Sequence, residues 1–508
     1  MIKNLKYLAF ASLSLVACSS DDDSGTVVEV PITSGQADFT KYIALGNSLT
    51  AGYSDNALFK EGQANSFAKL LADQFAFAGG GEFRIPYTND NVGGLLLGGN
   101  VIAGPRLVFN GVGPISLPNG VPTTEIAVPL SGPFNNLGVP GAKSFHLLAP
   151  GYGNIAGLAN GTANPYFVRF RSAPDATVLG DAMAQNPTFF SLWIGNNDVL
   201  GYATSGGDGT NPITDQAMFT GAYNMLVSTL TSAGAKGVLA NIPNITDLPH
   251  FRTVPYNPLS PTNPAFAPQI PVLNGTFAPL NQAFDFLGMP ERKIIFSETA
   301  ASAVVIHDES LPNISAQLTQ VLVGGGLDVP TATILGMQFG QSRQATRNDL
   351  LVLPASSVIA TLNQQYFAQL VAMGVPQATA GQLAINGITY PLRDKWVLLP
   401  SERAEIDAAT IAFNAVIKQA ADEKGLAFVD ANLLLKQLAV NGLRFGNYHL
   451  SSQFVTGGAF SLDGIHLSAR ANAYVANKFM EAINTTYSST LRMYGPENYP
   501  SQYPATLQ

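Results

Sequence analysis

The sequence predicts an α/β protein whose core is a doubly wound parallel sheet with helices on both faces. Short apolar runs alternate along the chain with longer segments in which apolar residues recur at helical spacing. Charged residues are 12% of the 508 residues and apolar residues are 46%, which excludes a disordered, charge-driven chain. The 49 glycines and 33 prolines indicate many turns and long connections rather than a bundle of long helices.

The first residues have the pattern of a signal peptide. Two lysines precede an apolar run of about 11 residues, which is too short to span a bilayer. The sequence Leu15–Cys18 resembles a bacterial lipoprotein lipobox, so we expect residues 1–17 to be a lipoprotein signal peptide and Cys18 to carry the lipid. The alternative is an ordinary secretory signal with an unrelated cysteine. Because Cys18 is the only cysteine, the chain can form no internal disulfide.

A short acidic run, Ser-Ser-Asp-Asp-Asp-Ser, follows at residues 19–24 and is expected to belong to a flexible tether over 18–37. Its position resembles the acidic export signal of Bacteroidetes surface lipoproteins, which implies an outer membrane lipoprotein exposed on the cell surface. A solvated linker on a periplasm-facing lipoprotein is the alternative. No other stretch has about 18 uncharged apolar residues, so we expect membrane contact only through the lipid anchor.

Four short apolar runs predict buried strands, and four amphipathic segments predict helices. The strands are expected at residues 41–45, 189–194, 237–242 and 426–429. The helices are expected to begin after Ser66, near Asp215, at Ser401 and after Ser468, where small polar residues precede the helical pattern. Gly234 and Gly425 are expected to end the second and third of these helices. Ligands bind such parallel sheets at the carboxyl ends of the strands.

The alternation breaks in two places. Residues of about 79–135 are rich in glycine and proline, and about 250–395 hold proline-rich loops with amphipathic pieces. Long irregular segments inside a compact domain are usually lids or binding loops. We therefore expect one domain over 38–485 with two insertions, followed by a loosely attached tail at 486–508.

Two motifs at opposite ends of the domain contain residues suited to nucleophilic catalysis. Ser48 lies on the turn after the first predicted strand, where it would be exposed at the mouth of the sheet. Asp463 and His466 are joined by a glycine turn just before the last helix, and a carboxylate can hold the tautomer of a histidine that moves protons. Each motif alone has an ordinary alternative, which is a helix-capping serine or an Asp-Gly turn with a surface histidine.

Two further motifs offer hydrogen-bond donors. Asn197 lies in Gly-Asn-Asn-Asp at the end of the second predicted strand, and its neutral amide can face a developing oxyanion. Gly141 follows a proline and can offer its backbone N–H at close range. Both motifs are also ordinary polar turns. Asp198 is expected to secure the loop rather than to take part in chemistry.

Together the four motifs resemble the SGNH, or GDSL-like, hydrolase family, and they occur in the family order Ser48, Gly141, Asn197, Asp463, His466. The resemblance covers the core and not the insertions. It implies a flavodoxin-like three-layer α/β/α fold. It also implies that Ser48 is the nucleophile, His466 the general base and Asp463 its orienting carboxylate. The N–H groups of Ser48 and Gly141 and the Asn197 amide would form the oxyanion hole.

The resemblance implies a serine esterase or lipase-like acylhydrolase that acts on lipid or other acyl esters. One departure is Asn47, where the family usually has aspartate. Alternatives are a carbohydrate acetyl esterase and a non-catalytic surface binding module on the same fold. Apolar stretches at 94–97 and 318–322 are expected either to line an acyl groove or to complete a core of their own.

Other site classes have weaker support. The net charge of −8 argues against a nucleic-acid partner, and no Gly-rich phosphate loop or Gly-x-Ser-x-Gly motif is present. His307-Asp308-Glu309 has metal-ligand residue types, but no second histidine follows at metalloprotease spacing, so we expect no metal and no other cofactor. His146, His250 and His449 are expected to be structural or surface residues. The oligomeric state is left open.

Overall fold

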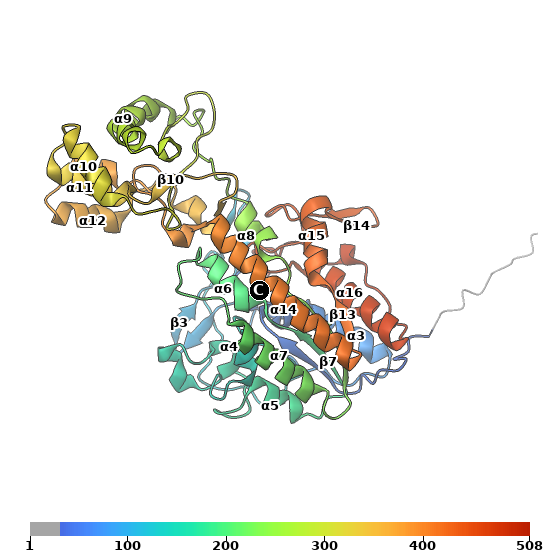
Figure 1. The fold of residues 1–508 in the computed structure, drawn as a ribbon. Coiled ribbons are helices and arrows are strands. Elements are labelled where there is room, and N and C mark those ends of the chain that lie inside the picture. Colours follow the sequence, from blue (N-terminus) through green and yellow to red (C-terminus); the bar gives the residue numbers. More distant parts are fainter. Residues whose placement is uncertain (1–30, 508) are drawn as a thin grey trace, which may run out of the picture. The chain divides into compact units, whose positions relative to one another are not determined.

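Five parallel strands form the central sheet of residues 31–507, which are the residues that the computed structural model describes. The strands are β1 (Tyr42–Gly46), β6 (Asn136–Gly138), β7 (Phe189–Trp193), β8 (Lys236–Ala240) and β13 (Ala427–Val429). They lie in the order β13-β8-β7-β1-β6, and Figure 1 labels β7 and β13 of this sheet. Counted along the chain this order is 2-1-3-4-5, one of the two common orders of doubly wound sheets. The predicted α/β class is confirmed.

The expected signal peptide, the lipidation residue Cys18 and the acidic run fall on residues 1–30, which lie outside the described residues. Residues 31–37, at the end of the expected tether, are described, and they contact the domain. The Gln36 N–H donates to the Tyr487 carbonyl at 2.7 Å, and Ala37 is buried. Within residues 31–507, no helix combines the length and apolarity needed to cross a membrane.

The strands are mostly apolar because helices cover both faces of the sheet (Figure 1); the exceptions are Asn136, Ser191 and Lys236. In β1, Ile43 and Leu45 belong to one hydrophobic core, and Tyr42 and Ala44 belong to the other. The first core includes residues of α5 (Val178–Met183), α7 (Gln216–Leu230) and α14 (Pro400–Lys424). The second includes residues of α3 (Phe67–Phe77) and α16 (Ala469–Tyr487).

The long core helices begin at the predicted polar residues. The side chains of Ser66, Asp215 and Ser468 each accept a hydrogen bond from a backbone N–H in the first turn of the helix that follows. One helix, α14, begins at Pro400 rather than at Ser401, because proline fits the first helical position, where no N–H is needed. The remaining helices of the core are α1 (Ser48–Ala51), α2 (Lys60–Ala64), α4 (Pro165–Val168), α6 (Asn196–Thr204) and α15 (Ala431–Asn441).

The fifth strand, β6, is not predicted by the sequence. It has only three residues, Asn-Leu-Gly, and its hydrophobic pattern is too short to recognise. Its place in the sheet comes from pairing with β1, in which Gly138 lies opposite Gly46. The Asn136 side chain adds a hydrogen bond to the Thr50 carbonyl at 2.9 Å.

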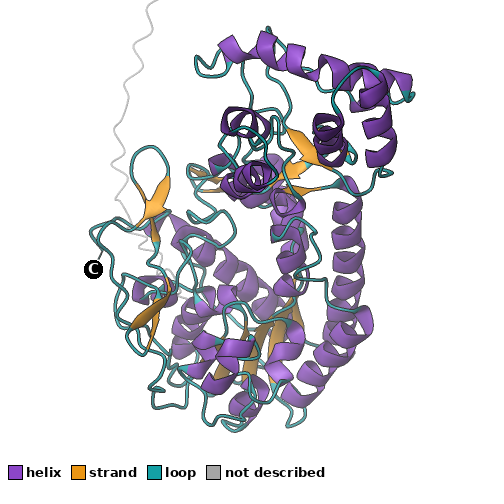
Figure 2. Cartoon of the chain, turned by 90° about the vertical axis from the view of Figure 1, so that its left-hand side faces the viewer, coloured by secondary structure: helices purple, strands orange, loops and turns teal. Residues whose placement is uncertain are grey.

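The segment at 79–135 contains two antiparallel hairpins (Figure 2). They are formed by β2 (Leu95–Leu97) with β3 (Asn100–Ala103) and by β4 (Leu107–Phe109) with β5 (Pro114–Ser116). Leu95 is buried in a small core with Ile126 and Val168. Of the two possibilities left open for the 94–97 stretch, the structure favours a core of its own.

The segment at 250–395 is mainly helical (Figure 2), and two short antiparallel strand pairs lie in it or at its end. Its helices are α8 (Pro249–Arg252), α9 (Ile270–Phe286), α10 (Ser315–Gly324), α11 (Val329–Phe339), α12 (Gln364–Ala372) and α13 (Gln377–Leu383). The strand pairs are β9 (Val305–His307) with β10 (Ser342–Gln344), and β11 (Leu350–Leu351) with β12 (Val397–Leu398). Leu318 and Leu322 are buried between these helices, and Leu322 also lines a pocket between α9 and α10.

The expectation of a loosely attached tail is wrong. Tyr503 is buried and its ring lies 5.0 Å from that of Phe59. The buried Arg106 guanidinium donates to the Pro504 carbonyl at 2.7 Å, and the Tyr494 hydroxyl donates to the Leu70 carbonyl at 2.8 Å. The tail has few periodic residues, but its tyrosines bury aromatic area against the core.

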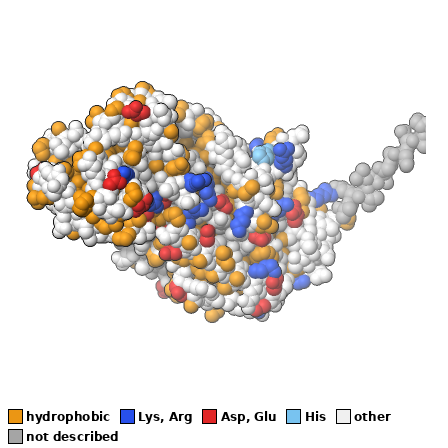
Figure 3. All heavy atoms as spheres, turned by 45° about the horizontal axis from the view of Figure 1, so that its top comes forward, with side chains coloured by type: hydrophobic (Ala, Val, Ile, Leu, Met, Phe, Trp, Pro, Cys, Tyr) orange, Lys and Arg blue, Asp and Glu red, His pale blue; other side chains and the backbone are white. Residues whose placement is uncertain are grey.

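Acidic and basic side chains are interspersed on the face drawn in Figure 3, and no continuous basic patch appears there.

A third hairpin, β14 (Leu443–Phe445) with β15 (Tyr448–Leu450), follows α15.

Candidate active site

Three predicted residues meet at the carboxyl edge of the sheet because their strands are in register. Gly46 of β1 lies opposite Gly138 of β6 on one side and Trp193 of β7 on the other. Ser48 follows Gly46 by two residues, and Gly141 follows Gly138 by three. Asn197 is in the first turn of α6, immediately after β7. This edge, between β1 and its neighbours, is the topological switch point where doubly wound sheets bind ligands.

Ser48 is the first residue of α1 and is held by its neighbour Asn47. The Asn47 side-chain oxygen accepts from the Leu49 N–H at 3.0 Å, which caps the helix. Its amide donates to the Asn196 side-chain oxygen at 3.2 Å. Asparagine therefore keeps the capping function that an aspartate would supply at this position. Ser48 itself is 8% exposed, so it is sheltered but reachable.

Ser48, His466 and Asp463 form a continuous hydrogen-bonded chain. Ser48 Oγ lies 2.8 Å from His466 Nε2, and His466 Nδ1 lies 2.8 Å from Asp463 Oδ2. The serine and the histidine are separated by 418 residues in the sequence. His466 comes from the loop before α16, and its side chain is 13% exposed. This is the geometry in which an imidazole takes a proton from a serine hydroxyl while a carboxylate fixes its tautomer.

Asp463 is surrounded by hydrogen-bond donors. Its Oδ1 accepts from the backbone N–H groups of Ile465 and His466 and from the Ser461 hydroxyl, at 2.8 to 3.0 Å. Its Oδ2 accepts from the Asn56 N–H at 3.0 Å as well as from the imidazole. Burial alone would raise the pKa of Asp463, but the imidazole and these donors hold that pKa well below its ordinary value. The carboxylate is therefore charged at neutral pH.

The possible oxyanion donors lie on loops that are tied together. The Asn197 amide donates one N–H to the Ala142 carbonyl at 2.9 Å, which fixes it beside Gly141. Its second N–H has no acceptor within residues 31–507. The backbone N–H groups of Ser48 and Gly141 likewise have no acceptor in the described part of the chain. Three donors are thus free around the end of β1.

Asp198 anchors the loop that carries Gly141. It is fully buried and accepts from both the N–H and the hydroxyl of Ser144, at 2.8 and 2.7 Å. Asn164 holds the other side of the loop by donating to the Pro140 carbonyl at 2.8 Å. Burial raises the pKa of Asp198, while the hydrogen bonds from Ser144 oppose that rise. The interpretation of Asp198 as a loop anchor agrees with these contacts.

Two residues that lie near His466 were not predicted from the sequence. The Tyr53 ring lies 4.7 Å from the imidazole ring and covers one side of it. Asp55 is 1% exposed; its Oδ1 accepts from the Leu462 N–H at 2.9 Å, whereas its Oδ2 has no partner within residues 31–507. Burial raises the pKa of Asp55 to about 7, and the nearby Asp463 adds to the rise. Nothing in their local sequence marks either residue as part of a site.

Two of the other histidines lie apart from this chain of contacts, whereas the His250 N–H donates to the Gly464 carbonyl at 3.0 Å, beside Asp463. His146 Nδ1 accepts from the Lys143 N–H at 3.0 Å and its ring stacks on Tyr152, and burial lowers its pKa to about 4. His250 is buried, and desolvation lowers its pKa to about 4. His449 is exposed on the third hairpin. The expectation of structural or surface roles agrees with these positions.

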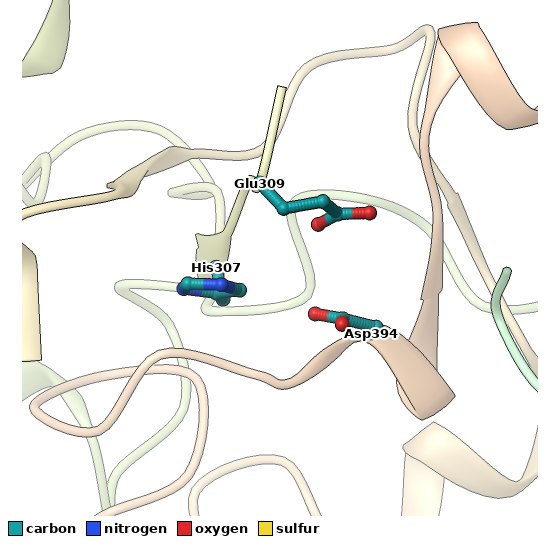
Figure 4. A group of neighbouring side chains, drawn as sticks. All are labelled: His307, Glu309 and Asp394. Atoms are coloured by element: carbon teal, nitrogen blue, oxygen red, sulfur yellow. The ribbon is translucent and has the colours of Figure 1, made fainter. Parts of the chain in front are cut away.

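One cluster outside this site has metal-ligand chemistry. Atoms of His307, Glu309 and Asp394 lie within 4.8 Å of one another (Figure 4). Asp308 does not join them, because it pairs with Arg343 at 2.6 Å. The sequence motif thus supplies two members of the cluster, and the third comes from a residue more than eighty positions later. The expectation that no metal is held here stays a prediction.

Comparison of the chain with protein-family models, with curated proteins and with solved structures finds no match in any of the three.

Proposed function

We propose that the chain is a serine ester hydrolase of the SGNH, or GDSL-like, type that works through an acyl-enzyme. The observation that carries this proposal is the hydrogen-bonded chain from Ser48 through His466 to Asp463 at the switch point of the sheet. The 2-1-3-4-5 strand order supports the flavodoxin-like three-layer architecture that this family implies. The segments at 79–135 and 250–395 are then insertions into that core.

In the acylation step, Ser48 Oγ attacks the carbonyl carbon of the ester while His466 Nε2 takes its proton. The charged Asp463 stabilises the imidazolium that forms. The carbonyl oxygen becomes an oxyanion and accepts hydrogen bonds from the N–H groups of Ser48 and Gly141 and from the Asn197 amide. When the intermediate collapses, the bond to the leaving oxygen breaks and His466 gives that oxygen its proton.

Deacylation repeats these steps with water. His466 removes a proton from the water as it attacks the acyl carbon of the Ser48 ester, and the same three donors bind the second oxyanion. Collapse returns the proton to Ser48 Oγ and releases the carboxylic acid. Ser48, His466 and Asp463 account for every proton transfer, so the proposed reaction needs no cofactor.

Acyl esters are the substrate class that the surroundings of Ser48 favour. An apolar cavity of about 90 Å³ lies beside the residues that flank the triad, and its walls include Leu49, Ile465 and Leu467. Trp193 and Phe479 also line it. An apolar wall would gain free energy by burying an acyl chain, whereas acetylated sugars need polar partners around the ring. Lipid or other acyl esters are therefore the proposed substrates.

The proposed location rests on the N-terminal sequence. A lipid on Cys18 would anchor the enzyme to the outer membrane, and the acidic run would direct it to the outer face of the cell. The membrane would then be a partner through this anchor alone, and no nucleic-acid partner is proposed.

The experiment that tests the function is labelling with a serine-reactive fluorophosphonate, combined with the Ser48→Ala variant. We expect the native chain to be labelled at Ser48 and to hydrolyse an activated short-chain ester. Removing the nucleophile is expected to lower kcat by about 10⁴- to 10⁶-fold, as triad deletions do elsewhere. The exposed Ser232→Ala variant serves as the matched control and should keep full activity.

Two outcomes would redirect the proposal. An unlabelled native chain with no hydrolysis would favour a non-catalytic binding module. Labelling combined with activity on acetylated xylan alone, and none on butyrate or longer esters, would favour a carbohydrate acetyl esterase.

A further inference from the structure

A second group of polar side chains gathers where the 250–395 segment meets α14. His307 ends β9, Glu309 follows two residues later, and Asp394 begins the short helix before β12 (Figure 4). These side chains point toward one another and come within 4.8 Å. Within residues 31–507 no N–H or hydroxyl group donates to these three side chains, although the Glu309 carboxyl approaches that of Glu402. Their ligand atoms are therefore available to something other than protein.

A fourth side chain, Glu402, lies against this group from the first turn of α14. It is 5% exposed, and its Oε2 accepts from the Leu399 N–H at 2.6 Å. Its Oε1 is buried and has no hydrogen-bond partner within residues 31–507. The Glu402 carboxyl faces that of Glu309, and Asp394 is also close enough to act on its charge. A carboxylate oxygen that is buried without a donor costs free energy unless a ligand satisfies it.

Within residues 31–507 no lysine or arginine forms an ion pair with these carboxylates, although the charge of Arg393 is close enough to act on His307. The ion pairs formed within the described part of the chain do not include Glu309, Asp394 or Glu402. The nearby Arg343 is taken up by Asp308 and Asp349, at 2.6 and 2.8 Å. Arg393 and Lys395 flank Asp394 in the sequence, and each lies over an aromatic ring.

We propose that His307, Glu309, Asp394 and Glu402 bind one divalent metal ion of the zinc class. His307, Glu309 and Asp394, whose ligand atoms lie within 4.8 Å of one another, supply one nitrogen and two oxygens, and Glu402 would complete the four-coordinate shell that Zn²⁺ takes in structural sites. Ca²⁺ and Mg²⁺ prefer sites built from oxygen alone, so the imidazole selects against them. None of the four residues belongs to the candidate active site, and the proposal stands whether or not the chain is an esterase.

The role of the ion would be to hold the helical segment on the core. Its ligands come from β9 and the residues just after it, from the short helix before β12 and from α14, and α14 packs directly against the sheet. Metal that binds only the folded arrangement of these elements stabilises that arrangement. Gly207, in the loop after α6, also approaches Glu402 so closely that a Cβ there would lie 2.0 Å from Oε1. The site thus joins the segment to the region that follows Asn197.

The test is a zinc titration of the purified full chain after treatment with a chelator. Calorimetry and elemental analysis are expected to show one Zn²⁺ bound per chain, with Ca²⁺ and Mg²⁺ binding at least tenfold more weakly. His307→Ala, Glu309→Gln, Asp394→Asn and Glu402→Gln should each weaken zinc binding by about 10- to 100-fold or more. His449→Ala and Glu423→Gln, which alter exposed residues elsewhere, are the matched controls and should bind zinc normally.

Two further measurements keep the test independent of folding defects. Zinc should raise the melting temperature of the native chain and of both controls, but not that of Glu402→Gln, which preserves the acceptor for the Leu399 N–H. X-ray absorption of the zinc-loaded chain should show one imidazole and oxygen ligands without sulfur. Sulfur in the zinc shell, or stoichiometric binding that survives all four substitutions, would overturn the proposal, and so would failure of the native chain to bind zinc.

Discussion

The two polar clusters of this protein differ in how each stabilises a buried carboxylate. Asp463 is a buried carboxylate whose oxygens accept five hydrogen bonds from the surrounding protein. Glu402 is equally buried, but only one of its oxygens has a donor, and two further carboxylates crowd it. The first site is electrostatically complete within the chain, whereas the second needs a cation or a proton from outside.

This difference predicts opposite responses to the same chemical change. Neutralising a carboxylate that the protein has surrounded with donors removes stabilisation and function. Neutralising a carboxylate that has too few donors relieves repulsion. Carboxylate-to-amide substitutions, which keep side-chain size, therefore test the comparison directly.

The largest effect is expected for Asp463→Asn. The amide keeps the size of the side chain but removes the charge that stabilises the His466 imidazolium, and it no longer selects the productive tautomer. We expect kcat to fall by about 10⁴-fold, as in the equivalent substitution of a serine protease triad. Steady-state kinetics on an activated ester measure the change, and a loss below tenfold would contradict the role given to Asp463.

Asp55 provides a sharper test. It lies near the triad and, like Glu402, is a buried carboxyl with one oxygen that has no hydrogen-bond partner within residues 31–507. Its pKa is raised to about 7 in the folded chain, so between about pH 4 and pH 7 the folded state holds a proton that the unfolded state releases. The free energy of unfolding should therefore decrease as the pH rises through this range.

Asp55→Asn should remove this pH dependence, because asparagine does not titrate and accepts the left-handed backbone found at residue 55. A pKa difference of about three corresponds to about 4 kcal/mol, so the variant should gain up to that amount relative to the native chain by pH 8. Urea denaturation at pH 5 and pH 8 measures the gain. The exposed Asp422→Asn variant is the control, and equal pH profiles for the native and Asp55→Asn chains would refute the assignment.

Asn197→Ala is expected to affect catalysis while leaving the charges of both clusters unchanged. Loss of one oxyanion donor typically lowers kcat by about 10²- to 10³-fold with a small change in KM. The neighbouring Asn196→Ala is a matched comparison, because Asn196 bonds to Asn47 inside the protein and should affect stability more than kcat. Reversed effects for the two asparagines would show that the oxyanion donor is assigned to the wrong residue.

The smallest effect is expected for Glu402→Gln in chelator-treated protein. The new amide can donate to Glu309 and the remaining oxygen still accepts from the Leu399 N–H, although the helix loses a favourable negative charge at its N-terminus. Burial raises the pKa of Glu402 to about 8, and the adjacent acids contribute to the rise. We expect the free energy of unfolding to increase by about 1 kcal/mol at neutral pH. A clear decrease in denaturation experiments would remove the contrast with Asp463.

The elements that the sequence predicted correctly are those with strong local signals. Apolar runs of four to six residues located β1, β7, β8 and β13, and capping residues located the starts of α3, α7 and α16. The order of motifs at strand ends also predicted that Ser48 lies near His466. These signals are local because hydrophobic period, capping and glycine turns depend on residues only a few positions apart.

The features that it missed depend on contacts between distant segments. The three residues of β6 become a strand only because β1 offers an open edge, and the tail is ordered because its tyrosines meet Phe59 and Leu70. Neither Asp394 nor Glu402 carries any sign of its neighbours in its own sequence.

The sequence by itself determined the parallel α/β core and the identities of the residues that form the serine–histidine–aspartate chain, because both follow from local patterns in a fixed order. Tertiary structure alone decided which carboxylates receive donors and which do not. That balance depends on packing between segments that lie scores or hundreds of residues apart, and it sets the charge of each buried group because an isolated buried charge is costly.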